Sequence, residues 1–322
     1  EKKRQADDAK YLERSEAIVK ALELTDKNKE ENKKPMVKPS EDGILKILTI
    51  GNSFSDDTMQ YVYKIAKSAG VEKIKLGNLY IGGCSLATHY TNAKNDSASY
   101  TYYYNDSGTW KTTSSYKMST ALKARSWDYV SMQQNSGNSG LESTYNSNLT
   151  NLITYVKGKL TNSKTKLVWH MTWAYQKDST HSSFANYDKN QTTMYNGIVT
   201  AVTNKILTNS NFDRVIPNGT AVQNMRSSYV GDTLTRDGYH MSYDQGRFLV
   251  ALMFVKSITG LDVAKNTYRP SGVSDTYAYV AVNAVNKAYS TPLKISKSVY
   301  NGNNPSSGYI QLQPKLTKGG FW

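Results

Sequence analysis

Short apolar segments alternate with longer amphipathic segments along most of this chain. The apolar segments are bounded by Gly, Asn, Asp or Pro, as buried strands usually are, and they cover residues 44–50, 73–81, 128–133, 166–172 and 213–217. Apolar residues at helical spacing predict helices over 56–69, 117–125, 143–159, 186–207, 243–259 and 274–289. This order predicts an α/β protein: a three-layer α/β/α sandwich around a five-stranded, mainly parallel sheet.

The two ends of the chain have a different pattern from the middle. Residues 1–40 are charged, with a thin apolar stripe that predicts one amphipathic helix followed by a Pro-containing linker. Residues 41–290 form the predicted main domain, and residues 291–322 read as a tail without a clear element. Inside the main domain, the tyrosine-rich segment 90–116 interrupts the alternation and predicts a hairpin inserted at the rim.

Composition narrows the classes of function. The chain has 322 residues, and no stretch is long and apolar enough to predict a transmembrane segment. The single cysteine, Cys84, excludes an intrachain disulfide, and the four histidines lack metal-ligand spacing, so we expect neither a metal nor another cofactor. The single cysteine fits a cytoplasmic protein or a disulfide-free bacterial exoprotein. Segments with few charges and many Asn, Ser, Thr and Tyr, such as SASYTYYYNDSGTW, favour a secreted or cell-surface protein, with no signal peptide in this chain.

The net charge of +14 raises the question of an acidic partner. The lysines are scattered, and the sequence contains neither a compact basic stripe nor a nucleic-acid-binding motif. We therefore expect no specific nucleic acid partner, and at most a loose attraction to anionic surfaces.

Small and polar residues follow three of the predicted strands and recur near the end of the main domain. The carboxyl ends of parallel strands meet at one edge of a sheet, where ligands bind in such folds. The groups that would gather there are Gly51-Asn52-Ser53, Gly82-Gly83-Cys84-Ser85, Gln133-Gln134-Asn135-Ser136-Gly137, and Asp237 three residues before His240.

These residue types suit ester hydrolysis. A serine hydroxyl such as that of Ser53 needs a neighbouring base, and the imidazole of His240 suits that task at neutral pH. Asp237 could hold the other ring nitrogen and stabilise the imidazolium. The backbone N–H groups of Ser53 and Gly83 and the side-chain amide of Asn135 could bind the negative charge that develops on the carbonyl oxygen. On its own the turn around Ser53 is ordinary turn composition, so the hypothesis depends on the whole set.

The order GNSFS, GGCS, QQNSG, DGYH resembles the SGNH (GDSL-like) hydrolases, whose four blocks contribute Ser, Gly, Asn and His, with Asp three residues before His. The phrases LYIGGCSLATHY, WDYVSMQQNS, WHMTWAY and RDGYHMS resemble the bacterial DUF4886 branch, and the likeness spans about residues 44–260. It implies Ser53 as nucleophile, Asp237 and His240 as its partners, and Ser53, Gly83 and Asn135 as oxyanion donors. Asn52 departs from the Asp of the name motif, and Gly82 could replace Gly83 as donor.

The predicted site favours a serine ester hydrolase. The resemblance and the rim aromatics together favour an acylated carbohydrate as substrate, with acetyl or another short acyl group released. A lipid-directed esterase or lipase, which should show a wide apolar mouth, and a non-catalytic glycan-binding surface protein with a vestigial triad are the alternatives. Five side chains are candidates for substrate contact, although packing or a salt bridge explains each of them as well: Trp110, His170, Trp173, Tyr175 and Arg226.

Overall fold

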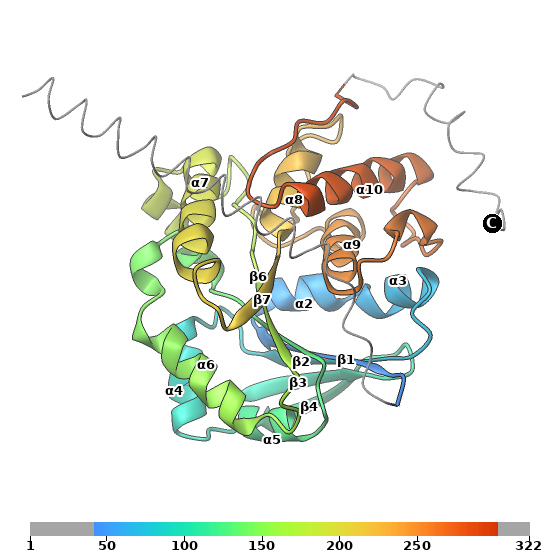
Figure 1. Cartoon of the computed structure of the whole chain (residues 1–322). Helices are drawn as coiled ribbons and strands as arrows, with labels where there is room; N and C mark the ends of the chain where they lie inside the picture. The colour runs from blue at the N-terminus through green and yellow to red at the C-terminus, as the bar shows by residue number, and fades with distance from the viewer. Residues whose placement is uncertain (1–41, 302–322) are drawn as a thin grey trace, which may run out of the picture.

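A computed structural model describes residues 42–301. The helix and linker predicted within residues 1–40 lie outside the described residues, as does the part of the tail beyond residue 301. Within the described range the chain forms an α/β structure with a central sheet between two helical layers (Figure 1).

The sheet contains seven strands in the order β4-β3-β2-β1-β5-β6-β7. The five predicted strands form its parallel part, β2-β1-β5-β6-β7. Their bounds are β1 Leu45–Gly51, β2 Ile74–Tyr80, β5 Tyr129–Met132, β6 Lys166–His170 and β7 Phe212–Ile216. All seven residues of β1 are buried, because both faces of this central strand are covered by helices.

The prediction of a five-stranded sheet is wrong, because the hairpin extends the sheet by two strands. Strands β3 (Tyr100–Asn105) and β4 (Lys111–Tyr116) pair antiparallel, and β3 also pairs antiparallel with β2. Pairing with β3 satisfies the backbone N–H and C=O groups that an uncovered β2 edge would leave open. The tyrosine-rich segment therefore forms the edge of the main sheet.

Helices cover both faces of the sheet (Figure 1). One layer contains α2 (Ser53–Met59), α3 (Val62–Ser68), α8 (Asn218–Arg226), α9 (Gln245–Thr259) and α10 (Asp275–Ser290). The other contains α4 (Leu86–Lys94), α5 (Met118–Lys123), α6 (Ser147–Lys159) and α7 (Gln191–Ala201). Helix α9 is buried along nearly its whole length, because α2, α3, α8 and α10 all pack against it.

Two helices differ in their bounds from the prediction. The helix expected over 56–69 is divided into α2 and α3 at Tyr61, whose hydroxyl donates to the backbone oxygen of Tyr243 at 2.9 Å. The helix expected over 186–207 begins late, because Asp188 has a left-handed backbone and the side chain of Asn190 caps α7 by accepting from the N–H of Thr193. A tertiary contact and a local cap thus set boundaries that apolar spacing does not encode.

Helices α4 and α8 were not expected from the apolar pattern. Helix α8 is polar in sequence but almost entirely buried, so its amides and hydroxyls find partners inside the protein. Asn224 of α8 accepts from the N–H of Ser296 at 2.7 Å, and Ser227 accepts from the N–H of Ser298 at 2.8 Å. The described start of the C-terminal tail is therefore held against α8.

Candidate functional site

Ser53 is the first residue of α2 and is separated from β1 by Asn52 alone. The side-chain oxygen of Asn52 caps the helix by accepting from the N–H of Phe54 at 3.0 Å. Ser53 therefore occupies a fixed turn between a buried strand and a helix. Its backbone N–H is one of the first N–H groups of α2, which have no acceptor within the helix.

Asn52 also connects three of the sequence blocks. Its oxygen accepts from the side-chain amide of Gln133 at 2.9 Å, and its own amide donates to the carbonyl oxygen of Cys84 at 3.1 Å. A carboxylate could not donate this second bond. In the sequence Asn52 is only a departure from the Asp of the name motif, whereas in the structure its neutral amide joins the turns after β1, β2 and β5.

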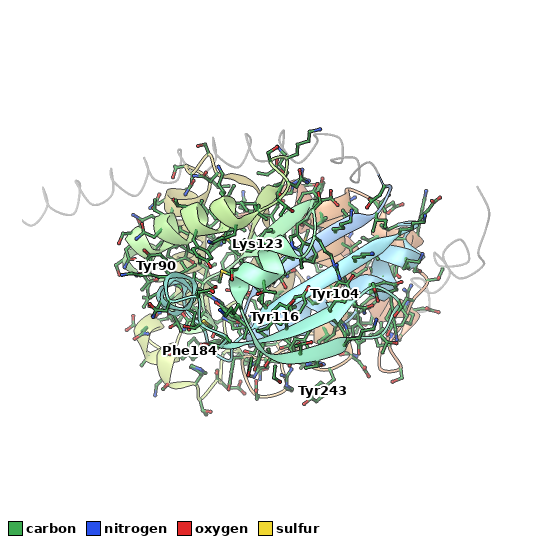
Figure 2. All side chains as sticks on the ribbon, turned by 90° about the horizontal axis from the view of Figure 1, so that it is seen from below. Tyr90, Tyr104, Tyr116, Lys123, Phe184 and Tyr243 are labelled. Atoms are coloured by element: carbon green, nitrogen blue, oxygen red, sulfur yellow. The ribbon has the colours of Figure 1, made fainter. Side chains whose placement is uncertain are left out.

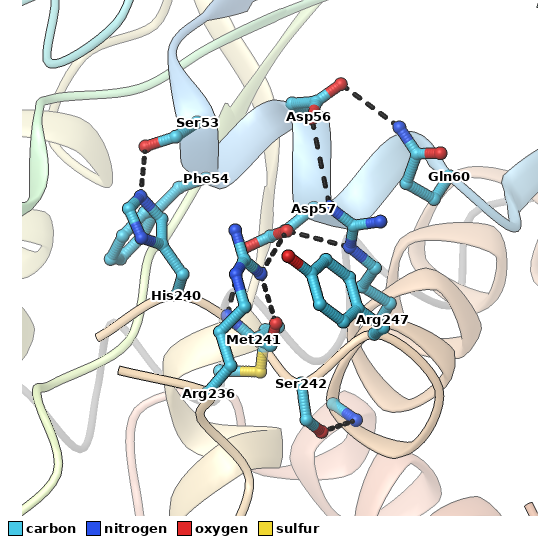
Figure 3. Close-up of polar contacts among 12 residues, drawn as sticks. Ser53, Phe54, Asp56, Asp57, Gln60, Arg236, His240, Met241, Ser242 and Arg247 are labelled. Atoms are coloured by element: carbon cyan, nitrogen blue, oxygen red, sulfur yellow. Dashed lines mark hydrogen bonds and ion pairs between the residues drawn. The ribbon is translucent and has the colours of Figure 1, made fainter. Parts of the chain in front are cut away.

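Ser53, His240 and Asp237 form one row of hydrogen-bonded side chains. His240 Nε2 lies 2.9 Å from Ser53 Oγ, as Figure 3 shows, and His240 Nδ1 lies 2.6 Å from Asp237 Oδ2. The second oxygen of Asp237 accepts from the backbone N–H of His240 at 2.8 Å, which explains their spacing of three residues. The row has the geometry that an activated serine nucleophile requires.

The carboxylate of Asp237 is stabilised in its charged form. Burial by itself raises the pKa of Asp237, but hydrogen bonds from the side chain and backbone of His240 and from the backbone of Tyr239 outweigh it, so the pKa is lowered. An ionised Asp237 keeps the proton of the imidazole on Nδ1. Nε2 is then free to accept the hydroxyl proton of Ser53.

The loop that carries this pair turns at Gly238, which has a φ of +92°. A Cβ at that position would lie 3.1 Å from Ser179 Cα, so both the conformation and the space favour glycine. The carbonyl oxygen of Gly238 accepts from the N–H of Gln176 at 2.8 Å, which fixes the loop to the segment after β6.

Asp57 connects the helix that carries Ser53 to the loop that carries His240 (Figure 3). It is fully buried, and one oxygen accepts from Arg236 at 2.9 Å and from Arg247 at 2.8 Å. The other oxygen accepts from the N–H of Met241, next to His240, at 2.9 Å. In the sequence Asp57 is only a first-turn acid of a helix. Its partners are nearly two hundred residues away, so no local signal could have identified it.

Gly83 and Asn135 lie together beside Ser53's turn. Gly83 has a φ of +63°, a conformation that glycine adopts without strain, and its backbone N–H donates to no group in the described part of the chain. The side-chain amide of Asn135 approaches the carbonyl oxygen of Gly83 at 3.4 Å. Since Asn52 ties both turns to α2, these donors belong to the same edge of the sheet as Ser53.

His170 is buried and does not reach Ser53. Its Nδ1 lies 2.9 Å from the side-chain oxygen of Gln133, and its Nε2 lies 2.8 Å from the side-chain amide of Asn218. Burial lowers its pKa to about 3, so the ring is neutral. His170 therefore orients Gln133, which in turn bonds Asn52, and it has no surface to offer a substrate.

Trp173, Tyr175 and Arg226 are also inside the protein. The Trp173 ring stacks on Phe54 with centroids 4.2 Å apart, and its N–H donates to the carbonyl oxygen of Tyr239 at 2.8 Å. The hydroxyl of Tyr175 pairs with that of Ser136 at 2.8 Å, while the ring is fully buried. Trp173 thus supports the residue before His240, and sequence reasoning had left this packing role open.

The guanidinium of Arg226 forms an ion pair of 2.7 Å with Asp232 and donates to the carbonyl oxygen of Ala174 at 2.9 Å. Burial lowers its pKa to about 10, and Asp232 acts in the opposite direction. Because the guanidinium of Arg226 already pairs with Asp232 and Ala174 inside the protein, it does not bind a substrate carboxylate.

Cys84 and Trp110 have different environments. Burial raises the pKa of the Cys84 thiol to about 12, so it is not a nucleophile at neutral pH.

Trp110 is only partly buried, lies between β3 and β4, and lines a cavity beside α2. Of the five substrate-contact candidates, it alone remains at a cavity surface near Ser53's helix.

Among residues 42–301 no group of three or more His, Cys, Asp or Glu side chains is arranged to hold a metal ion. Within the same residues, no helix combines the length and the apolar character that crossing a membrane would require.

The comparisons with known proteins agree with the sequence blocks. None of the curated proteins matches the chain. The family described as a domain of unknown function, DUF4886, matches residues 46–288. The crystal structure of a DUF4886 family protein from Bacteroides uniformis ATCC 8492 is 35% identical, with a TM-score of 0.77 over 80% of this chain and 100% of that one.

Two other solved structures have lower sequence identity and lower TM-scores. A protein from Slackia heliotrinireducens, provisionally described as an SGNH hydrolase, is 18% identical, with a TM-score of 0.43 over 67% of this chain and 99% of that one. LAE5, an alpha/beta hydrolase enzyme from the metagenome of Lake Arreo in Spain, is 13% identical, with a TM-score of 0.40 over 66% of this chain and 94% of that one. The match over residues 46–288 and the fold shared with a solved member establish that this chain belongs to the DUF4886 family.

Proposed function

We propose that this protein is a serine ester hydrolase that removes acetyl or another short acyl group from carbohydrate. The observation that carries the proposal is the row Asp237–His240–Ser53, with bonds of 2.6 and 2.9 Å. A serine that only completes a turn needs neither a histidine on its hydroxyl nor a carboxylate behind that histidine. The resemblance of the four sequence blocks to SGNH hydrolases supports the same reaction.

The reaction proceeds through an acyl-enzyme. Ser53 Oγ attacks the ester carbonyl carbon while its proton passes to His240 Nε2, and the C–O bond to the alcohol breaks as His240 returns that proton to the leaving oxygen. Water then attacks the acyl-Ser53 carbonyl, again through His240, and releases the carboxylic acid. In both steps the N–H groups of Ser53 and Gly83 and the amide of Asn135 donate to the carbonyl oxygen.

The structure contains an apolar cavity that lies away from the proposed site. A cavity of about 290 Å³ is lined by Leu45, Tyr129 and Ile258 among others. Leu45 is the first residue of β1, so this cavity lies at the far end of the strand from Ser53, about 20 Å away at the rise of a strand. It therefore cannot hold the acyl chain of an ester that reacts at Ser53.

The test compares hydrolysis of p-nitrophenyl acetate and p-nitrophenyl octanoate by the wild-type protein and Ser53→Ala, with mass detection of a serine-directed fluorophosphonate. We expect preferential cleavage of the acetate, and loss of both turnover and labelling in the variant. A wild-type protein that neither turns over nor labels would contradict the proposal and favour a non-catalytic glycan-binding protein. Preference for the octanoate would instead favour the lipid-directed esterase.

A further inference from the structure

A second cavity lies between α2 and the edge of the sheet. It has a volume of about 220 Å³, smaller than the roughly 300–1,000 Å³ of pockets for drug-sized ligands, so its size suits a single ring. Side chains from α2, β2 and the β3–β4 hairpin line it: Asp56, Met59, Gln60, Asn78, Tyr103, Trp110 and Thr112.

Asn78 is 1% exposed and is one of the residues that line this cavity. Its oxygen accepts from the hydroxyls of Thr49 at 2.8 Å and Ser55 at 3.0 Å. Its Nδ2 has no hydrogen-bond partner among the described residues, and neither has the indole N–H of Trp110. Buried polar groups without partners are rare, and each normally has a reason. Here two donors belong to residues that line the same cavity.

Asp56 supplies an acceptor from α2. Its carboxylate accepts from Gln60 at 3.1 Å and lies 4.0 Å from Arg247, which leaves acceptor capacity on its two oxygens. Burial raises the pKa of Asp56, although Arg247 acts in the opposite direction. The aromatic rings of Tyr103 and Trp110 supply apolar faces beside these polar groups.

The cavity lies along the helix that carries the proposed nucleophile. Ser53 and Asp56 are three residues apart on α2, so they lie on neighbouring positions of one helix face and about 5 Å apart along its axis. Tyr80 connects the cavity with the oxyanion turn: its ring lies 5.8 Å from that of Tyr103, and a Cβ at Gly82 would be 3.3 Å from its hydroxyl. A ligand that extends from the cavity past Tyr80 would therefore approach the oxyanion turn beside Ser53.

We propose that this cavity is the binding site for the alcohol part of the substrate, and that its ligand is a single hydroxylated pyranose or furanose ring. Sugar hydroxyls both accept from Asn78 and Trp110 and donate to Asp56, and the C–H face of the ring packs on the aromatic side chains. The inference rests on the proposed ester hydrolysis and adds the site that selects the alcohol.

The substrates that test this site are methyl mono-O-acetyl-xylopyranoside and cyclohexyl acetate. Both are acetate esters of a six-membered ring, and only the first has hydroxyls. We expect the wild-type protein to prefer the xyloside in kcat/KM by at least about tenfold, because the cyclohexyl ring leaves the amide and indole donors unpaired. Equal kcat/KM for the two esters would overturn the proposed selection of a hydroxylated ring.

Two variants address the cavity itself. Trp110→Leu removes an aromatic wall, and Thr112→Trp, at an exposed position paired with Tyr103, fills the cavity. Both should lower kcat/KM for the xyloside about tenfold and remove most of its preference over cyclohexyl acetate. A uniform loss on both substrates, or no loss on the xyloside, would contradict the subsite.

Tyr104→Leu is the matched control. Tyr104 belongs to the same hairpin but alternates with Tyr103 and so lies on the other face of β3, stacked near Tyr102. In Figure 2 Tyr104 and Tyr116 lie along the hairpin edge of the sheet, on the side of Lys123 in α5. This variant should leave the preference for the xyloside unchanged.

A direct binding measurement separates failure of the subsite from failure of the proposed reaction. Saturation-transfer NMR of the full Ser53→Ala chain with methyl xylopyranoside should show contact that Trp110→Leu abolishes. If the wild type is inactive on every ester, a positive signal still supports the sugar site and only the esterase proposal fails. If esters are cleaved but methyl xylopyranoside gives no Trp110-dependent signal, the sugar site is overturned and the esterase stands.

Discussion

His240 and His170 lie at the same edge of the sheet, and both ring nitrogens of each have polar partners. His240 contacts a carboxylate and a hydroxyl, and its side chain is 18% exposed. His170 contacts two amide side chains and is 2% exposed. One arrangement can take up a proton and pass it on, whereas the other keeps the ring neutral, with burial lowering its pKa to about 3.

The comparison shows that the partners of a histidine, more than its place in the fold, decide what it does. A carboxylate behind the ring compensates the positive charge that forms when the ring accepts a proton. The amides around His170 offer no such compensation in a buried site. His170 therefore acts as a rigid link to Gln133 and Asn52, and indirectly holds the turn of Ser53.

The largest expected effect comes from removing the proton acceptor. His240→Gln should lower kcat/KM for p-nitrophenyl acetate by about 10⁴-fold, because an amide cannot take the proton of Ser53. Since the residue is partly exposed, stability should change by less than about 1 kcal/mol. Steady-state kinetics and urea unfolding measure both, and a loss of less than about tenfold would contradict the assignment.

Removing the compensating carboxylate sharpens the comparison. Asp237→Asn places an amide behind His240, as amides surround His170, and should lower kcat/KM by about 10²–10⁴-fold.

The lowered pKa of Asp237 adds a test by pH. The charge of Asp237 stabilises the folded protein above the ordinary pKa of 3.8, and this stabilisation is lost as pH falls through the lower pKa of the folded state. In Asp237→Asn the free energy of unfolding should therefore fall less between about pH 4 and lower pH than it does in the wild type. Equal pH dependence of the two proteins would contradict the charged state assigned to Asp237.

Removing the charge of Asp57 should have a smaller effect than the two changes above, and it should lower both stability and activity. Asp57→Asn removes the charge between Arg236 and Arg247 and should cost about 3 kcal/mol in the free energy of unfolding. Below the unfolding transition, kcat/KM should fall about tenfold because the N–H of Met241, next to His240, loses a charged acceptor.

Asp56→Asn is the matched control for Asp57, because its carboxylate lies 4.0 Å from Arg247. It should cost less than about 1 kcal/mol in the free energy of unfolding, against about 3 kcal/mol for Asp57→Asn. Rescue of kcat by Asp57→Glu would identify positioning, while a variant that only loses stability would reduce Asp57 to a structural role.

The smallest expected effect concerns His170 and needs only a change of pH. The unfolded chain takes up a proton on His170 below the ordinary pKa of 6.5, whereas the folded protein does so only near pH 3. Stability should therefore fall by about 2 kcal/mol between pH 6.5 and 5 through this residue. Buried His89, with its pKa also lowered to about 3, should add a similar amount.

Urea unfolding of the wild type and His170→Gln at pH 7 and pH 5 measures this difference. The variant should lose about half of the wild-type pH dependence. An unchanged pH dependence in the variant would show that His170 is not held neutral, and the contrast with His240 would then disappear.

The sequence alone determined the parallel core of the sheet and the membership of the DUF4886 family. Its apolar segments are local and bounded by turn residues, so the five buried strands could be read directly. The blocks around Ser53, Gly83, Asn135 and His240 are also local patterns. Because parallel strands end at one edge, the sequence indicated that these blocks would meet there, and in the structure they do.

Only the tertiary structure decided which polar residues work together over long separations. Asp57 reaches Arg236 and Arg247, Asn52 joins three turns, and His170 and Arg226 are buried among internal partners. The addition of the hairpin to the sheet edge likewise depends on β3 meeting β2. Periodicity reports how one segment meets the core, whereas hydrogen bonds and edge pairing depend on two segments, and the partner of a side chain is known only once the chain has folded.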